Sequence, residues 1–175
     1  MFKNEEETMR IIIKQKYFTV GDKFKITDEN DAVVFFAVRQ FDRIMSNVVL
    51  FDKNDKPLLR VQAELKKFFT TYFEVNDAYG AKLFAIDEKL PFFGFKRAKT
   101  VGNIDVKIKC GPIHMKAYIS DGSGSYDKTP VVRARKKLLS IADTYVVDID
   151  ETRIRSEFGA VLGIWYDLVK HSKTH

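Results

Sequence analysis

The first half of the chain contains three copies of a sequence pattern that is typical of β-hairpins. Residues 26–35, 50–59 and 73–83 each place an Asn-Asp pair between two apolar, β-branched or aromatic runs, and the pairs lie about 22 to 24 residues apart. Asn and Asp tolerate the left-handed backbone conformation and bond to their own main chain, as tight hairpin loops require. Each segment is therefore predicted to form strand, turn and strand, and this repetition constrains the architecture more than any other feature.

Further strands extend the pattern over most of the chain. A fourth hairpin is predicted with strands at 115–120 and 131–135 around a longer loop, and single strands are predicted at 9–15, 95–101, 104–109 and 144–149. The total is about eleven or twelve strands, and no linker divides them. We therefore predict one domain over residues 1–175, with 1–8 as a flexible N-terminus, that folds into a mainly β sandwich or barrel of repeated antiparallel hairpins.

The end of the chain breaks the strand pattern. Several N-cap residues follow residue 150, and the apolar stretch 158–169 then predicts a helix, which we place at 152–171. Its apolar residues fall on nearly every side, so it needs burial all round. Because a barrel of about twelve strands has a lumen too wide for strand side chains alone, we predict that the helix fills it, with Gly159, Ala160 and Gly163 allowing close approach. The alternative is a helix packed between two open sheets or against a partner protein.

Composition narrows the class of protein. Cys110 is the only cysteine, so no intramolecular disulfide can form, and a reducing compartment such as the cytoplasm fits best. Acidic residues stand near the N-terminus where a signal peptide would carry an apolar core. No stretch approaches the roughly 20 apolar residues that span a bilayer, which predicts a soluble protein. The formal net charge of +6 favours anionic partners, although the basic residues form no long block.

Two stretches resemble the LURP-one-related family, and the likeness covers nearly the whole chain. Residues 13–30 are similar to the family's opening pattern of a Gln-Lys, an aromatic residue, a Gly-Asp and a strand running into an Asp-Glu turn, and residues 136–145 resemble its closing pattern. Asp31 and Ala142 depart from it, since the family commonly has Gly at both positions. The resemblance implies a twelve-stranded barrel around a central C-terminal helix, the fold shared with tubby C-terminal domains and phospholipid scramblases.

The resemblance also orders the functions, although a fold does not fix one. Tubby domains are associated with phosphoinositide binding, and scramblases with lipid movement and calcium, so an anionic phospholipid or phosphoinositide headgroup is the leading expected ligand. A protein with that ligand would be cytoplasmic and peripheral at a membrane.

Two basic clusters are the candidate headgroup sites. In an extended strand Arg133, Arg135 and Lys137 lie on one face, so three cations converge on one anion. The same residues would equally serve to keep a barrel exterior soluble. The full candidate set is Lys96, Arg97, Lys99, Arg133, Arg135, Lys136 and Lys137.

Other readings of the chain stay open. The aromatic run 92–95 beside the first cluster suits a core strand better than insertion at a membrane interface. A nucleic-acid or transcription-associated role draws support from the pI of about 9.3 and from the interleaved Lys66, Lys67, Phe68, Phe69, Tyr72 and Phe73. That role requires exposed aromatic rings on which bases can stack. A protein-interaction scaffold is a further alternative, whereas the apolar helix opposes a small-molecule carrier with its ligand inside the barrel.

No catalytic or metal-binding motif stands out. The only imidazoles belong to His114, His171 and His175, and no nucleophile elbow, phosphate-binding loop or His-Glu-x-x-His occurs. The turn that begins at Asp28 lacks the glycine and the final glutamate of an EF-hand. The loop 121–127 reads as a solvated turn, and Cys110 as a buried structural thiol. We expect a non-catalytic binding module without cofactor or metal.

Overall fold

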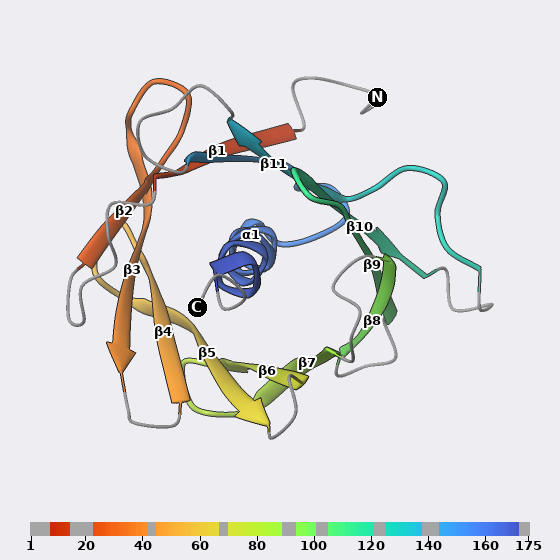
Figure 1. Cartoon of the computed structure of the whole chain (residues 1–175). Helices are drawn as coiled ribbons and strands as arrows, with labels where there is room; N and C mark the ends of the chain where they lie inside the picture. The colour runs from red at the N-terminus through yellow and green to blue at the C-terminus, as the bar shows by residue number, and fades with distance from the viewer. Residues whose placement is uncertain are drawn as a thin grey trace.

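The strands form one closed antiparallel barrel, and a helix runs through its lumen (Figure 1). The structure is a computed structural model that describes residues 8–14, 23–41, 45–66, 70–88, 94–100, 105–120, 125–137 and 144–171. The strands are β1 (Thr8–Lys14), β2 (Lys23–Thr27), β3 (Val33–Phe41), β4 (Met45–Asp52), β5 (Pro57–Lys66), β6 (Thr70–Asp77), β7 (Lys82–Glu88), β8 (Gly94–Thr100), β9 (Asp105–Cys110), β10 (His114–Ile119), β11 (Val132–Lys137) and β12 (Thr144–Asp150). The helix is α1 (Ser156–His171).

The first strand closes the barrel. β1 pairs with β12 along its whole length, from Thr8 opposite Asp150 to Lys14 opposite Thr144. On its other side β1 pairs with β2 through Ile12 and Ile13. Every other strand pairs with its neighbours in sequence, so the barrel is an up-and-down meander. The predicted barrel of repeated antiparallel hairpins is therefore confirmed.

The three predicted hairpin turns share one hydrogen-bonding scheme, which holds β2–β3, β4–β5 and β6–β7 together. Asp28, Asp52 and Asp77 each open a turn, and one carboxylate oxygen of each accepts backbone N–H groups two and four residues later. The donors are the amides of Asn30, Ala32, Asn54, Lys56, Tyr79 and Ala81. The aspartate thus satisfies amides that the ladder leaves open.

The fourth residue of each turn adopts a left-handed backbone. The φ angle is 59° at Asp31, 64° at Asp55 and 90° at Gly80. Asp31 therefore occupies a position that suits glycine, the residue that the family resemblance leads us to expect there. The third Asn-Asp pair does not match the first two, because Asp77 opens its turn whereas Asp31 and Asp55 occupy the left-handed position. The repeated unit is the opening aspartate and the left-handed residue, not the Asn-Asp pair.

Helix α1 is buried on all sides, as its apolar pattern predicted. Residues 160–162 and 164–166 are each at most 2% exposed. Trp165 meets Phe73 of β6 edge-on with ring centroids 6.4 Å apart, and Tyr166 meets Tyr145 of β12 at 5.8 Å. The prediction that the helix occupies the lumen is confirmed.

Two glycines let β12 and β1 approach the helix. A Cβ on Gly159 would lie 2.6 Å from Ile149, and one on Gly163 would lie 2.8 Å from Val147 and 3.0 Å from Ile13. The helix begins at Ser156, later than the predicted start at residue 152. Residues 151–154 form a turn instead, because Asp150 accepts the amide and the hydroxyl of Thr152.

Among the described residues, the buried acid Asp167 and the partly buried Arg39 face the interior. Asp167 of α1 is 1% exposed, and Arg39 continues the inward alternation of the buried Phe35 and Ala37 along β3. Burial lowers the pKa of Arg39, and the negative charge of Asp167 acts in the opposite direction. Asp167 therefore offsets part of the cost of placing Arg39 inside the barrel.

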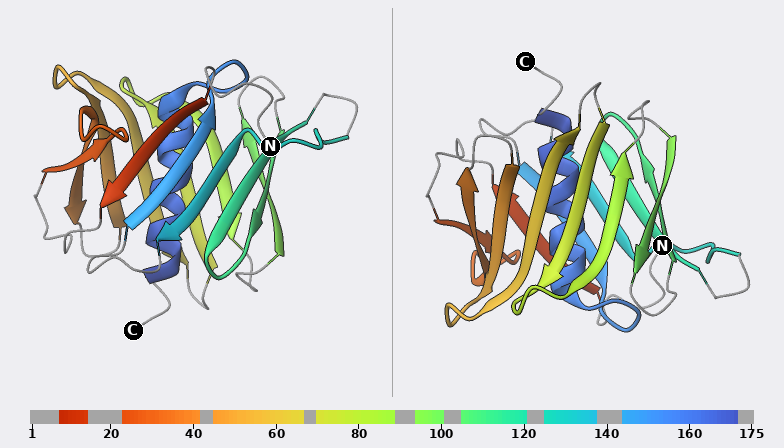
Figure 2. Two further views of the ribbon diagram at one scale, coloured as in Figure 1. Left: turned by 90° about the horizontal axis from the view of Figure 1, so that it is seen from above. Right: turned by 90° about the horizontal axis from the view of Figure 1, so that it is seen from below.

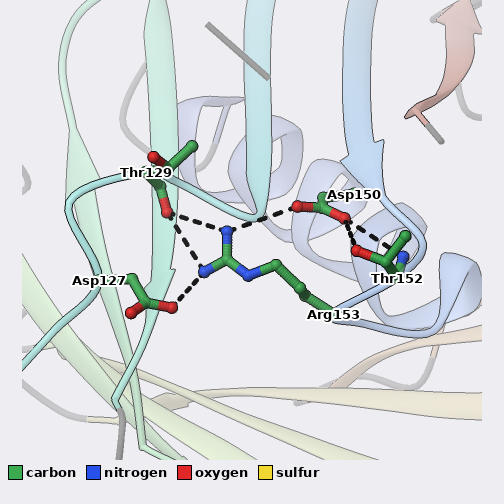
Figure 3. A network of polar contacts seen from close by, with 5 residues as sticks. All are labelled: Asp127, Thr129, Asp150, Thr152 and Arg153. Carbon is green, nitrogen blue, oxygen red and sulfur yellow. Dashed lines mark hydrogen bonds and ion pairs between the residues drawn. The ribbon is translucent and has the colours of Figure 1, made fainter. Parts of the chain in front are cut away.

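The barrel has two distinct ends, which we name the entry rim, where α1 begins, and the exit rim, where α1 ends. Figure 2 shows the β4–β5 and β6–β7 turns at the entry rim and the β9–β10 turn at the exit rim. At the entry rim Arg153 joins the β10–β11 loop to the β12–α1 connection (Figure 3). Its guanidinium donates to the Thr129 carbonyl oxygen at 3.4 Å and pairs with Asp127 and with Asp150, the latter at 3.4 Å.

Candidate functional site

Strand β11 carries the second predicted cluster on the outside of the barrel. Arg133, Arg135 and Lys137 alternate with the buried Val132 and Ala134, which face the helix side of the sheet. Arg135 and Lys137 are exposed, and Arg133 is half-buried. The three cations share one face, as the alternation predicted.

Lys136 does not belong to this face. Its partner across the ladder is Tyr145, which is fully buried in the interior. Because neighbouring residues of a strand point to opposite faces, Lys136 alternates away from Arg135 and Lys137. The outward face of β11 therefore brings together Arg133, Arg135 and Lys137 but not Lys136.

The first predicted cluster lies on β8, and its side chains fall outside the described residues, as does the aromatic run that precedes it. The backbone register pairs Arg97 with Lys107, Lys99 with Asp105 and Lys96 with Ile108. Strands β9 and β10 separate β8 from β11. The two predicted clusters are therefore not neighbours. The outer surface of β9 and β10 lies between them.

That surface contains cations that the sequence had not marked as a site. Lys109 of β9 lies directly opposite Lys116 of β10, and Lys116 lies opposite Arg133 of β11. Side chains directly opposite in an antiparallel ladder have Cβ atoms about 4.5–5.5 Å apart, and like charges placed there destabilise the sheet. Three strands thus present a continuous row of positive charge. We name the basic face as Lys107, Lys109, Lys116, Arg133, Arg135 and Lys137.

An acidic residue ends the row on β12. Asp148 lies opposite Arg133 on one side and Arg10 on the other. Its side chain is only 10% exposed, accepts a hydrogen bond from Arg10 Nε, and lies 3.7 Å from Arg135 Nη2. The hydrogen bonds to Asp148 and Glu29 raise the pKa of Arg10, which stays charged. Asp148 therefore fixes the edge of the basic face and holds Arg135 beside it.

The entry side of the basic face is framed by aromatic rings. Lys107 lies opposite Tyr118 of β10, and its ammonium sits 5.1 Å from the ring centroid of Tyr126. Tyr126 belongs to the β10–β11 loop and bridges back to Ser120. Lys107 is thus half-buried, whereas Lys109 projects into solvent nearer the exit rim.

The remaining predicted features occupy other places. Phe73 is 1% exposed and packs on Trp165, so it cannot serve as a base-stacking platform. Cys110 is buried, as predicted. Among the described residues, no three His, Cys, Asp or Glu side chains gather to hold a metal ion. Within the same part of the chain, no helix is both long and apolar enough to cross a membrane.

The comparisons with known proteins agree with the likeness seen in the sequence. The family model described as LURP-one-related matches residues 9–167. Neither curated proteins nor solved structures gave a match to the chain. The matched segment runs from β1 to the buried aspartate of α1 and includes the whole basic face. The chain belongs to the LURP-one-related family.

Proposed function

We propose that this protein is a non-catalytic module that binds anionic phospholipid headgroups, phosphoinositides among them, through the basic face. The row formed by Lys109, Lys116 and Arg133 is the observation that supports the proposal. Their positions opposite one another across the ladder bring three cationic side chains close together. A phosphate group placed beside them would accept charge-assisted hydrogen bonds.

The shape of the basic face favours a membrane over a small soluble anion. Its cations spread over three strands, or about 10 Å at the usual strand spacing, on the convex outside of the barrel. Each Lys or Arg near an anionic bilayer contributes about 1 kcal/mol. Of the three exposed cations, Lys109, Arg135 and Lys137, Arg135 contributes less because it pairs with Asp148. Together they contribute about 2–3 kcal/mol, roughly 30- to a hundredfold in affinity. Such a protein would act in the cytoplasm at a membrane surface.

Nucleic acid is the competing polyanion. The same cations would attract it, but the buried Phe73 removes one aromatic ring on which that reading relied. The likeness to tubby and scramblase domains also favours lipid. If no anionic ligand binds, the alternative function is that of a protein-interaction scaffold.

Vesicle cosedimentation tests the proposal. The protein is mixed with vesicles of phosphatidylcholine alone, with phosphatidylserine added, or with a phosphoinositide added, at low and moderate salt. We expect binding only to the anionic vesicles, weakening as salt screens the charges. Absence of binding to all three compositions would refute the proposed function.

A charge-matched pair of variants locates the site. Lys109→Gln with Lys116→Gln removes two cations of the row, and Lys25→Gln with Arg60→Gln removes two exposed cations from β2 and β5. We expect the first pair to weaken binding about tenfold or more and the second pair to change it about twofold or less. Equal losses would show that net charge alone attracts the protein and that the basic face is not the site.

A further inference from the structure

The β9–β10 turn exposes an apolar tip at the exit rim. Pro112 and Ile113 form its two central residues, and both are exposed. Ile113 is 45% exposed, and within the described part of the chain the other large apolar side chain left in solvent is Tyr79, at 94%. Tyr79 lies in the β6–β7 turn at the entry rim. The two exposed apolar groups therefore mark opposite ends of the barrel.

The tip is held in place by three different elements. The Gly111 N–H donates to the His114 carbonyl oxygen at 2.8 Å, and the Lys136 N–H of β11 donates to the Ile113 carbonyl oxygen at 2.9 Å. From the lumen, the Tyr166 hydroxyl of α1 donates to the Gly111 carbonyl oxygen at 3.0 Å. The His114 ring packs so closely that a Cβ on Gly111 would lie 2.6 Å from it. A tip fixed in this way loses little conformational freedom on binding.

Exposed cations of the basic face surround the tip. Lys109 precedes it on β9, Arg135 lies opposite His114, and Lys137 ends β11 at the same rim. All three side chains are exposed. Proteins that bind a membrane interface commonly place apolar groups at the acyl boundary and cations at the level of the phosphates.

Acidic side chains gather in the three aspartate turns. Residues 28–32, 52–56 and 77–81 carry Asp28, Glu29, Asp31, Asp52, Asp55 and Asp77 beside Lys53 and Lys56, and ion pairs join Glu29 to Arg10, Asp31 to Lys14 and Asp55 to Lys23. These turns attract an anionic surface less than the exposed cations around the tip do.

We propose that the protein docks on an anionic bilayer with its exit rim down, so that Pro112 and Ile113 insert at the boundary between headgroups and acyl chains. Lys109, Arg135 and Lys137 then contact the phosphates around the tip. This inference rests on the proposed lipid binding and adds to it the inserting element and the orientation of the barrel.

Two matched serine variants test the contribution of the tip. Ile113→Ser is compared with Tyr79→Ser in cosedimentation with phosphatidylserine vesicles, and both are compared in binding to soluble inositol hexakisphosphate. We expect Ile113→Ser to bind vesicles about five- to tenfold more weakly, because part of an isoleucine side chain no longer leaves water. Its binding to the soluble phosphate should be unchanged, and Tyr79→Ser should match the wild type in both. Vesicle binding by Ile113→Ser equal to that of the wild type would overturn the inference.

A fluorescent reporter shows insertion directly. Trp165 is fully buried and supplies a constant background, so Ile113→Trp and Tyr79→Trp each add one responsive ring. With anionic vesicles we expect a blue shift and quenching by brominated acyl chains for Ile113→Trp alone. A bound Ile113→Trp protein without quenching would refute insertion while leaving headgroup binding intact, whereas a wild type that binds no vesicle would refute both proposals.

Discussion

Replacing Gly159 by alanine should destabilise the protein although alanine is the better helix former. In an open helix the change stabilises by about 1 kcal/mol. Here the new Cβ would lie 2.6 Å from Cγ1 and Cδ1 and 2.8 Å from Cγ2 of Ile149, which is fully buried on β12. A β-branched side chain has little freedom to rotate away. Overpacking a core costs about 1–3 kcal/mol, and three close contacts place this site near the upper end, which leaves a net loss of about 1–2 kcal/mol.

Urea denaturation followed by Trp165 fluorescence measures the effect. We expect a lower midpoint with an unchanged m-value and a fall in Tm of about 2–8 °C. The control is the same substitution in an Ile149→Ala background, where the clashing atoms are gone and Gly159→Ala should stabilise instead. A wild-type background in which Gly159→Ala raises the midpoint would refute close packing of α1 against β12.

Three further substitutions probe the turns and the edge of the basic face. Gly80→Ala meets no atom within 4 Å at a φ of 90°, so it should cost about 1 kcal/mol through backbone strain alone, and an unchanged urea midpoint would contradict this. Tyr166→Phe should lose about 1 kcal/mol with its bond to Gly111. Burial raises the pKa of Tyr166 above its usual 10.0. The unfolded chain therefore loses this proton first, and stability falls as the pH rises above 10.0. Thermal melts should show a smaller fall in Tm over that pH range for Tyr166→Phe than for the wild type. Asp148→Asn should lower stability by about 1–3 kcal/mol, because Arg10 keeps Glu29 but loses the more buried of its two carboxylate partners. It should also tighten vesicle binding by removing the anion of the row, and weaker vesicle binding would contradict the placement of the site.

The fold was predictable because local and global signals agree. A filled barrel is indicated by the turn aspartates, by the alternation along the strands and by the helix without a polar face. Gly159 and Gly163 lie where the helix contacts β12 and β1 most closely, as their small size predicted. The turn register was less visible: the third Asn-Asp pair sits at the start of its turn, because Gly80 takes the left-handed position. The predicted helix start is too early, because residue types that favour the N-cap also form the turn around Asp150.

The candidate site was predictable only in part. Alternation along one strand placed Arg133, Arg135 and Lys137 together, since that geometry is local. The row through Lys109 and Lys116 depends on the register between β9, β10 and β11. That register cannot be predicted from the sequence of any single strand. A run of cations looks uniform in sequence although its members alternate across the sheet, so the sequence alone groups Lys136 with its neighbours.

Chemical-shift mapping would show directly whether the basic face binds an anionic bilayer. Uniformly ¹⁵N-labelled protein is titrated with nanodiscs that contain a phosphoinositide, with phosphatidylcholine nanodiscs as the reference. We expect the largest selective amide shifts and line broadening at Lys109, Lys116 and Arg133, extending to Ile113 at the exit rim. Perturbations centred on β2 to β5, or no difference between the two kinds of nanodisc, would contradict it.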